Sequence, residues 1–284
     1  MSEPLYFEDF RVGMSFEGAA RTITAQDHEA FMALTGDLGA VHRDPEVAAA
    51  AGFDGVVTNG PLGIGVVFGQ LYDLGIVEPT ALATLDLEWS FRRPLLVGAS
   101  VQARILVTRC RRSTRRQAGL VGRHLALVDD AGRVLQEGAS TMLVQARHRS
   151  GHDDHAVATD FGTVAWAEAL VPLLTSSEPF RSAVDTFDGS IGLQAGRDAV
   201  VLRVYKGAIL EVARNTPHGP TFTLCGTERA WTQLALAPRN DLLARLSRDE
   251  FWATGDIFEY LRMTKALVAI WDAARSLAAS VVAP

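Results

Sequence analysis

Leu34-Thr35-Gly36-Asp37-Leu38-Gly39-Ala40-Val41-His42 is the stretch from which the rest of the chain can be understood. Upstream of it, Thr24 followed three residues later by Asp27 has the pattern of a helix N-cap with a capping box. Apolar side chains then recur at helical spacing. The pattern predicts a helix from about Ala25 to Thr35 that ends at Gly36.

Directly after this helix, Asp37 and His42 share one short loop of small residues. A histidine titrates near neutral pH, and a carboxylate beside it can fix its tautomer or help to activate a water molecule. The pair is therefore a candidate acid/base site. The alternative is structural, because an aspartate after a helix-ending glycine often forms a turn and a single loop histidine often has no chemical role.

A second stretch, Val57-Thr58-Asn59-Gly60-Pro61-Leu62-Gly63, opens a long apolar run. Proline at the first helical position predicts that a buried helix begins at Gly60. The backbone N–H groups of Gly60 and Leu62, at the positive end of the helix dipole, suit a thioester carbonyl that gains negative charge during reaction.

Glycines recur inside this predicted helix, at positions 63, 65 and 69. The segment is too short and too interrupted to span a membrane. We expect these glycines to let a sheet wrap closely around the helix.

From Ala81 the periodicity changes from helical to alternating. Strands are predicted over 85–91, 101–107, 120–128 and 134–144, with a turn at 129–132. Sequential strands pair with their neighbours, so the chain is expected to form an antiparallel sheet whose dry face covers the helix.

Composition limits the classes of function. The 284 residues are 48% hydrophobic and 21% charged, which suits two globular domains. The net charge of −6 argues against a nucleic-acid partner. The first residues lack the pattern of a signal peptide, and two distant cysteines suggest no disulfide framework, so a cytoplasmic setting without a membrane span is expected.

Arginines cluster between two predicted strands. Bidentate guanidinium groups suit the phosphates of coenzyme A, which makes Arg109, Arg111 and Arg112 candidate phosphate contacts. A solvated hairpin tip is the alternative.

The alternating pattern ends near Arg147, and a second unit is predicted to begin near Gly162. Three histidines and two aspartates lie between them without the spacing of metal ligands, so residues 148–161 are interpreted as a hydrated linker and no metal site is predicted. The predicted domains are 1–147 and 162–284. In the second, the sequence predicts a helix from Trp166, a hairpin across Lys206-Gly207, a strand over 221–225 and a final helix over 257–279.

The first domain resembles the MaoC-like (R)-specific enoyl-CoA hydratase family, whose hot-dog fold wraps an antiparallel sheet around one helix. The family signature is Gly-Asp-x-Asn-Pro-aliphatic-His. Gly36, Asp37, Val41 and His42 match it, whereas Gly39 and Ala40 stand in place of Asn and Pro. Asn59-Gly60 stands where many members have His-Gly.

This resemblance implies a hydro-lyase that acts on an acyl thioester, with Asp37 and His42 as catalytic residues and Gly39 and Asn59 as supporting residues. Coenzyme A or a carrier protein would be part of the substrate, and no separate cofactor is expected. The family also implies a homodimer. Two alternatives stay open: a thioesterase or biosynthetic dehydratase or cyclase of the same fold, and a non-catalytic lipid-binding or acyl-CoA-binding protein.

Residues 162–280 resemble the sterol-carrier-protein-2-like family, in which a sheet and helices enclose an apolar tunnel. The residues that carry the likeness are Val200-Val-Leu-Arg-Val-Tyr-Lys-Gly207, Thr227-Glu-Arg-Ala-Trp231 and Phe251-Trp-Ala-Thr-Gly255-Asp256. The resemblance implies a lipid-binding domain, so the expected fold class is α+β, a hot-dog domain followed by an α/β domain. A domain kept for dimerisation or stability is the alternative.

Overall fold

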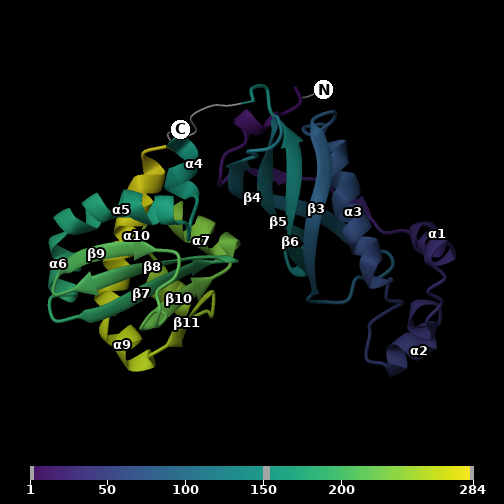
Figure 1. Cartoon of the computed structure of the whole chain (residues 1–284). Coiled ribbons are helices and arrows are strands. Elements are labelled where there is room, and N and C mark those ends of the chain that lie inside the picture. The colour runs from purple at the N-terminus through teal and green to yellow at the C-terminus, as the bar shows by residue number, and fades with distance from the viewer. Residues whose placement is uncertain (1–2, 150–153, 282–284) are drawn as a thin grey trace. The chain divides into compact units, whose positions relative to one another are not determined.

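The computed structural model describes residues 3–149 and 154–281. The described residues divide into two compact units (Figure 1). The N-terminal unit ends at Arg149 and lacks only the segment Arg11–Gly13, which is grouped with the C-terminal unit. Each unit has its own sheet.

The N-terminal unit contains a six-stranded sheet of order β1-β4-β5-β6-β3, with β2 paired to β4. All of its pairs are antiparallel. The strands are β1 (Ser15–Glu17), β2 (Arg21–Thr22), β3 (Ala81–Phe91), β4 (Ser100–Arg112), β5 (Ala118–Asp129) and β6 (Val134–Gln145). The predicted alternating runs are therefore strands, and β3 is at one edge.

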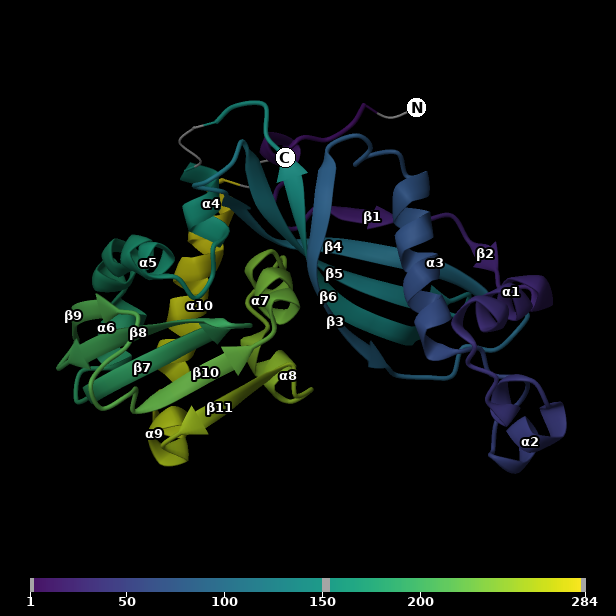
Figure 2. The same cartoon turned by 45° about the vertical axis from the view of Figure 1, so that its right-hand side comes forward.

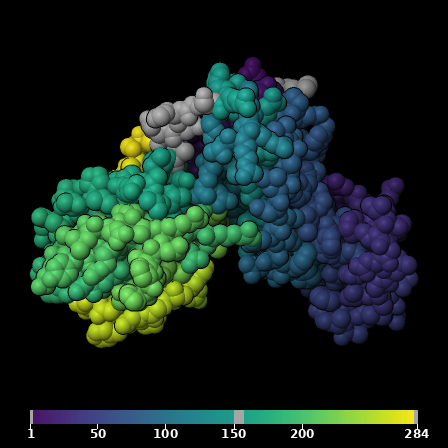
Figure 3. Space-filling view, viewed as in Figure 1, coloured from purple at the N-terminus to yellow at the C-terminus, as the bar shows by residue number. Residues whose placement is uncertain are grey.

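Two predicted helices of this unit are confirmed. Helix α1 (Ala25–Thr35) begins with the Thr24–Asp27 capping box and ends at Gly36, which has φ 71°. Helix α3 (Gly60–Asp73) has proline in its first turn. Three short helices also occur, namely η1 (Phe7–Asp9), η2 (Ala40–His42) and α2 (Pro45–Ala50). The α1 and α2 segment forms the purple and indigo lobe of this unit in the space-filling view (Figure 3).

Helix α3 lies against one face of the sheet, as the sequence predicts (Figure 2). Its buried face carries Leu62, Val66, Val67 and Leu71, which pack on alternate side chains of β4 and β5 such as Leu125. Alternation places every second strand residue on this face, so burial against α3 determines the register of the sheet.

The glycines of α3 have two different surroundings. A Cβ atom at Gly63 would lie 2.4 Å from Oε1 of Gln136 on β6, so the sheet does approach the helix closely there. A Cβ atom at Gly65 or Gly69 would have no neighbour within 4 Å. The prediction that all three glycines admit the sheet is therefore wrong for these two, because they lie on the side of the helix away from it.

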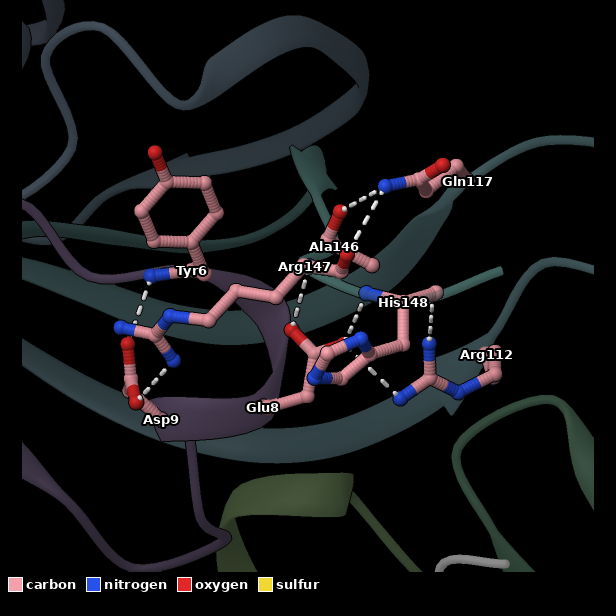
Figure 4. A network of polar contacts seen from close by, with 8 residues as sticks. All are labelled: Tyr6, Glu8, Asp9, Arg112, Gln117, Ala146, Arg147 and His148. Carbon is pink, nitrogen blue, oxygen red and sulfur yellow. Dashed lines mark hydrogen bonds and ion pairs between the residues drawn. The ribbon is translucent and has the colours of Figure 1, made fainter. Parts of the chain in front are cut away.

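A polar network ties the chain's first residues to the end of β6 (Figure 4). Glu8 accepts hydrogen bonds from the backbone N–H of Arg147 at 2.9 Å and of His148 at 3.1 Å, and from Arg112 at 3.2 Å. Arg147 also forms an ion pair with Asp9 at 2.6 Å. These contacts hold the N-terminal segment against the strand ends.

The C-terminal unit has a five-stranded sheet of order β11-β10-β7-β8-β9. Its strands are β7 (Asp188–Ala195), β8 (Asp198–Tyr205), β9 (Ala208–Ala213), β10 (Phe222–Gly226) and β11 (Phe251–Gly255). The predicted hairpin is β8 and β9, while β7 and β11 were not predicted. The pairing of β10 with β7 is parallel.

Seven helices belong to the described part of the C-terminal unit: α4 (Asp154–Thr159), α5 (Val164–Ser176), α6 (Glu178–Ala183), α7 (Glu228–Ala235), α8 (Leu242–Leu246), α9 (Ile257–Arg262) and α10 (Thr264–Ala279). Two of them differ from the predictions. Helix α4 lies within the segment interpreted as a linker, where Ala158 is buried; residues 150–153 of that segment lie outside the described residues. The predicted final helix is two helices, because Met263 leaves the helical path with ψ 10°.

An aromatic cluster fills the core of this unit. Trp231 lies 4.6 Å from Trp271 between ring centroids and 5.6 Å from Trp166, and all three rings are fully buried. Such rings bury more apolar area than any other side chain and dominate the energetics of a core.

Candidate active site

The candidate site begins where α1 ends. Gly36 donates its N–H to the carbonyl of Met32 and takes the left-handed conformation, which glycine adopts without strain. The chain then turns through Asp37 and Gly39 into η2, which ends at His42. This short segment therefore carries both candidate side chains toward the residues that precede α3.

Asp37 is held by Asn59, the residue that precedes α3. Nδ2 of Asn59 donates to Oδ2 of Asp37 at 2.6 Å and to its backbone carbonyl at 3.2 Å. The hydrogen bond from Asn59 lowers the pKa of Asp37 below its ordinary value, and the Gly39 backbone and the charge of His42 act in the same direction. Asp37 is thus an exposed, ionised carboxylate in a defined orientation.

His42 is oriented from the other side. Its Nδ1 lies 2.7 Å from the carbonyl oxygen of Val57. A carbonyl only accepts, so Nδ1 carries a proton and Nε2 is the nitrogen left for chemistry. The backbone carbonyl of His42 accepts in turn from Nε2 of His28, a buried residue of α1 whose ring lies 6.3 Å from that of His42.

Gly39 separates the two candidate catalytic groups. A Cβ atom built at Gly39 would lie 3.7 Å from Oδ1 of Asp37, 3.7 Å from Nε2 of His42 and 3.1 Å from its Cδ2. The two side chains therefore flank one small space, which a side chain at position 39 would enter. The structure brings the predicted pair together, while their catalytic role stays a prediction.

The N-terminus of α3 offers fewer N–H donors than the sequence suggests. Leu62 donates its N–H to the carbonyl of Asn59 at 3.0 Å, and Pro61 has none. The N–H of Gly60 has no hydrogen-bond partner among the described residues. Of the two donors predicted for a thioester carbonyl, only Gly60 is therefore available, because the first helical turn already uses Leu62.

Three residues of the sheet fix the position of Gly60. Gln136 donates from Nε2 to the Gly60 carbonyl at 3.2 Å and accepts from Nε1 of Trp89 at 3.0 Å. The ring of Phe91 would lie 2.9 Å from a Cβ atom at Gly60. The sequence predicts a strand over 85–91, but nothing in it connects Trp89 and Phe91 with the site.

Residues 9–127 match the family described as the MaoC like domain. This part of the chain forms a MaoC-like domain. None of the curated proteins compared with the chain matches it. The match ends before residue 162, so the sterol-carrier-protein-2-like assignment of residues 162–284 stays a prediction.

Several solved structures are similar to the MaoC-like domain. A monoamine oxidase regulatory protein from Archaeoglobus fulgius is 23% identical, with 51% of this chain and 97% of that chain covered and a TM-score of 0.48. An unliganded (R)-hydratase from Pseudomonas aeruginosa is 19% identical, covers 51% and 88%, and has a TM-score of 0.44. An (R)-hydratase from A. caviae involved in PHA biosynthesis is 24% identical, covers 49% and 98%, and has a TM-score of 0.40.

The arginines proposed as phosphate contacts lie at the other end of the MaoC-like domain's sheet. The site is near the start of β4, where Thr58 donates to the carbonyl of Leu95. From Val101 to Arg109, an extended strand covers about 26 Å. Arg112 is already bound to Glu8 and to the carbonyl of His148. The structure therefore does not bring Arg109, Arg111 and Arg112 together with Asp37 and His42 in one MaoC-like domain.

In residues 3–149 and 154–281, no group of three or more His, Cys, Asp and Glu side chains is arranged to hold a metal ion. None of the helices found there is both long and apolar enough to cross a membrane.

Proposed function

We propose that the MaoC-like domain is a hydro-lyase that adds water to a trans-2-enoyl thioester or removes it from an (R)-3-hydroxyacyl thioester. The observation that carries this proposal is the space beside Gly39, which is flanked by Oδ1 of Asp37 and Nε2 of His42. A carboxylate and an imidazole that flank one space can hold one water molecule between them. The family match of residues 9–127 supports the same chemistry.

In the hydration direction, Asp37 accepts a hydrogen bond from the water and Nε2 of His42 removes its other proton. The hydroxide forms the new bond to C3, and the proton is returned to C2. The chain prepares each residue for this step, because the hydrogen bond from Asn59 lowers the pKa of Asp37 and the Val57 carbonyl holds a proton on Nδ1 of His42, which leaves Nε2 to face the water.

The thioester carbonyl would accept a hydrogen bond from Gly60. Negative charge moves onto the carbonyl oxygen as C3 is attacked, and one well-placed N–H donor is worth about 3 kcal/mol of transition-state stabilisation. Phe91 and Gln136 hold Gly60 in place for this purpose. Coenzyme A or a carrier protein would supply the thioester, and no further cofactor is needed for the proton transfers.

Turnover of a trans-2-enoyl-CoA, with chiral analysis of the product, tests this function. Asp37→Asn and His42→Ala should each lower kcat at least about 100-fold, because each removes a group that transfers or positions a proton. Asp54→Asn and His218→Ala are matched controls, since both residues are exposed and lie outside the site. Unchanged turnover in the Asp37 and His42 variants would contradict the proposal.

A thioesterase or another dehydratase of the same fold is the second candidate. The observation in its favour is Gly39, which leaves more room beside His42 than the asparagine of the family signature would. Release of free coenzyme A from a saturated acyl-CoA would identify a thioesterase. Binding without any turnover would instead favour a lipid-binding or acyl-CoA-binding protein.

We also propose that two copies of the domain pair through β3 into a homodimer. Strand β3 has a partner on one side only, and Leu82, Leu85 and Leu87 are exposed along it. Such an edge is a template for pairing with another strand.

The C-terminal unit would shelter or deliver a hydrophobic acyl group, and copurifying lipid detected by mass spectrometry would test that role.

A further inference from the structure

A buried arginine lies under the central helix of the MaoC-like domain, outside the acid/base site. Arg123 belongs to β5 and is only 3% exposed. Its guanidinium lies 5.5 Å from the ring centroid of Phe68, so the side chain points toward α3. It forms no ion pair with any of the residues that the structure describes.

The contacts of Arg123 are too weak to offset the burial of a full charge. Nη1 donates to the thioether sulfur of Met142 at 3.4 Å, and Nε has no acceptor among the described residues. A thioether is a weak acceptor, and a charge removed from water without a counter-ion costs several kcal/mol. Burial lowers the pKa of Arg123 to about 10, so the group is still a cation at neutral pH.

Two independent measures give the distance from the site to this cation. Along α3, eight residues separate Gly60 from Phe68, which corresponds to about 12 Å. Along β5, four residues separate Leu127 from Arg123, which corresponds to about 13 Å. Leu127 pairs with Gln136, the residue that contacts Gly60. The two measures agree, so the cation lies one medium-length acyl chain away from the predicted carbonyl position.

A row of paired residues runs across the sheet from Arg123 to the edge strand β3. Arg123 is paired with Ser140 of β6, and Ser140 is paired with Leu87 of β3. Paired residues share a face, so all three lie on the side of α3. Leu87 is 37% exposed. Two strand spacings, about 10 Å in total, separate it from Arg123. In this row, Ser140 stands between Arg123 and Leu87.

We propose that Arg123 binds a carboxylate at the far end of the substrate's acyl group, so that the preferred substrate is an acyl thioester with a second, terminal acid function. This inference rests on the hydro-lyase function proposed above. A carboxylate matches the planar, two-donor face of guanidinium and would supply the counter-ion that the described residues do not.

The test compares two trans-2-enoyl-CoA substrates with the same number of carbons, one ending in a methyl group and one in a carboxylate. For the unmodified protein, we expect kcat/KM to be at least tenfold higher for the carboxylate. Arg123→Met removes the charge at similar length and should abolish this preference without lowering the melting temperature, because an unpaired buried charge does not stabilise the fold. Arg104→Met is the matched control, since Arg104 on β4 is half-exposed and pairs with Glu17.

Calorimetric binding of the saturated analogue that ends in a carboxylate separates the two proposals. Tighter binding than for the methyl-ended analogue, lost in Arg123→Met, would support the subsite even if neither enoyl substrate were hydrated. In that case only the hydro-lyase function would fail. Equal affinity and equal kcat/KM for the two chain ends in the unmodified protein would overturn the inference and leave the hydro-lyase function intact.

Discussion

Nδ2 of Asn59 lies 2.6 Å from Oδ2 of Asp37, although 22 residues separate them in the chain. Asn59 is 1% exposed and immediately precedes α3, whereas Asp37 is exposed on the loop after α1. The buried residue therefore determines where the exposed carboxylate points. This relationship couples the charge state of the candidate site to the position of the central helix.

Asn59→Ala should shift the pH dependence of activity. Without its largest favourable hydrogen bond, the pKa of Asp37 should rise toward the ordinary value, so the acid limb of kcat/KM should move to higher pH. At neutral pH, loss of orientation should lower kcat roughly 10- to 100-fold. A pH–rate profile measures both effects, and an acid limb that does not move would show that Asn59 does not control Asp37.

Gly39→Ala should reduce activity with little change in stability. The backbone of Gly39 has φ −50° and ψ 139°, which alanine adopts without strain. Its new Cβ atom would lie 3.1 Å from Cδ2 of His42 and would occupy the space proposed for water. We expect kcat to fall at least about tenfold. Equal melting temperatures for the two proteins would confirm that the fold is retained.

Gly63→Ala and Gly65→Ala form a matched pair on α3. The methyl group at position 63 would meet the amide of Gln136 at 2.4 Å, which should destabilise the domain by about 1–3 kcal/mol. The methyl group at position 65 meets nothing within 4 Å, and helix propensity alone should stabilise by about 0.5–1 kcal/mol. Denaturant unfolding measures the change in the free energy of unfolding of each variant. Equal changes would contradict the different surroundings of Gly63 and Gly65.

Glu8→Gln should weaken the N-terminal unit and reduce its sensitivity to acid. Burial opposes ionisation of Glu8, but the hydrogen bonds from the backbone of Arg147 and His148, together with that from Arg112, leave its pKa below the ordinary value. A carboxyl group with a lowered folded-state pKa stabilises above its unfolded pKa of about 4.3, and this contribution is lost as pH falls through the folded value.

At pH 7 the loss in Glu8→Gln should be about 1.5–3 kcal/mol, the range for hydrogen bonds to a charged group. Melting temperatures recorded from pH 3 to pH 7 should therefore converge for the variant and the original protein at the acid end. Glu46→Gln, at an exposed residue of α2, is a suitable control. Parallel curves that keep the same separation down to pH 3 would contradict this role for Glu8.

Local signals predicted much of the N-terminal unit. Signals for helix ends act over only a few residues. The ends of α1 and the start of α3 could therefore be located without tertiary information, from the Thr24–Asp27 capping box, Gly36 and Pro61. Alternation likewise located β3 to β6. In the C-terminal unit, β7 was missed because four consecutive residues of it are buried, which leaves no clear period-two pattern. Strand β11 was missed because its five residues are too few to establish one.

The composition of the site was only partly predictable. Asp37 and His42 are close in sequence, and their residue types alone indicated acid/base chemistry. Asn59 was predicted as a supporting residue, but its bond to Asp37 depends on how the loop after α1 meets α3. His28, Phe91 and Gln136 carry no local signal for the site, because each contributes through a contact made across the fold.

By itself, the sequence determined the elements whose free energy is local: the capped α1, the proline-initiated α3 and the alternating strands of an antiparallel sheet. Tertiary structure decided which groups meet. It used the N–H of Leu62 inside the first turn of α3, placed the arginine hairpin at the opposite end of the sheet, and enclosed Arg123 beneath the helix. The physical reason is that caps and periodicity act over a few residues, whereas hydrogen-bond partners and charge burial depend on chain segments brought together by packing.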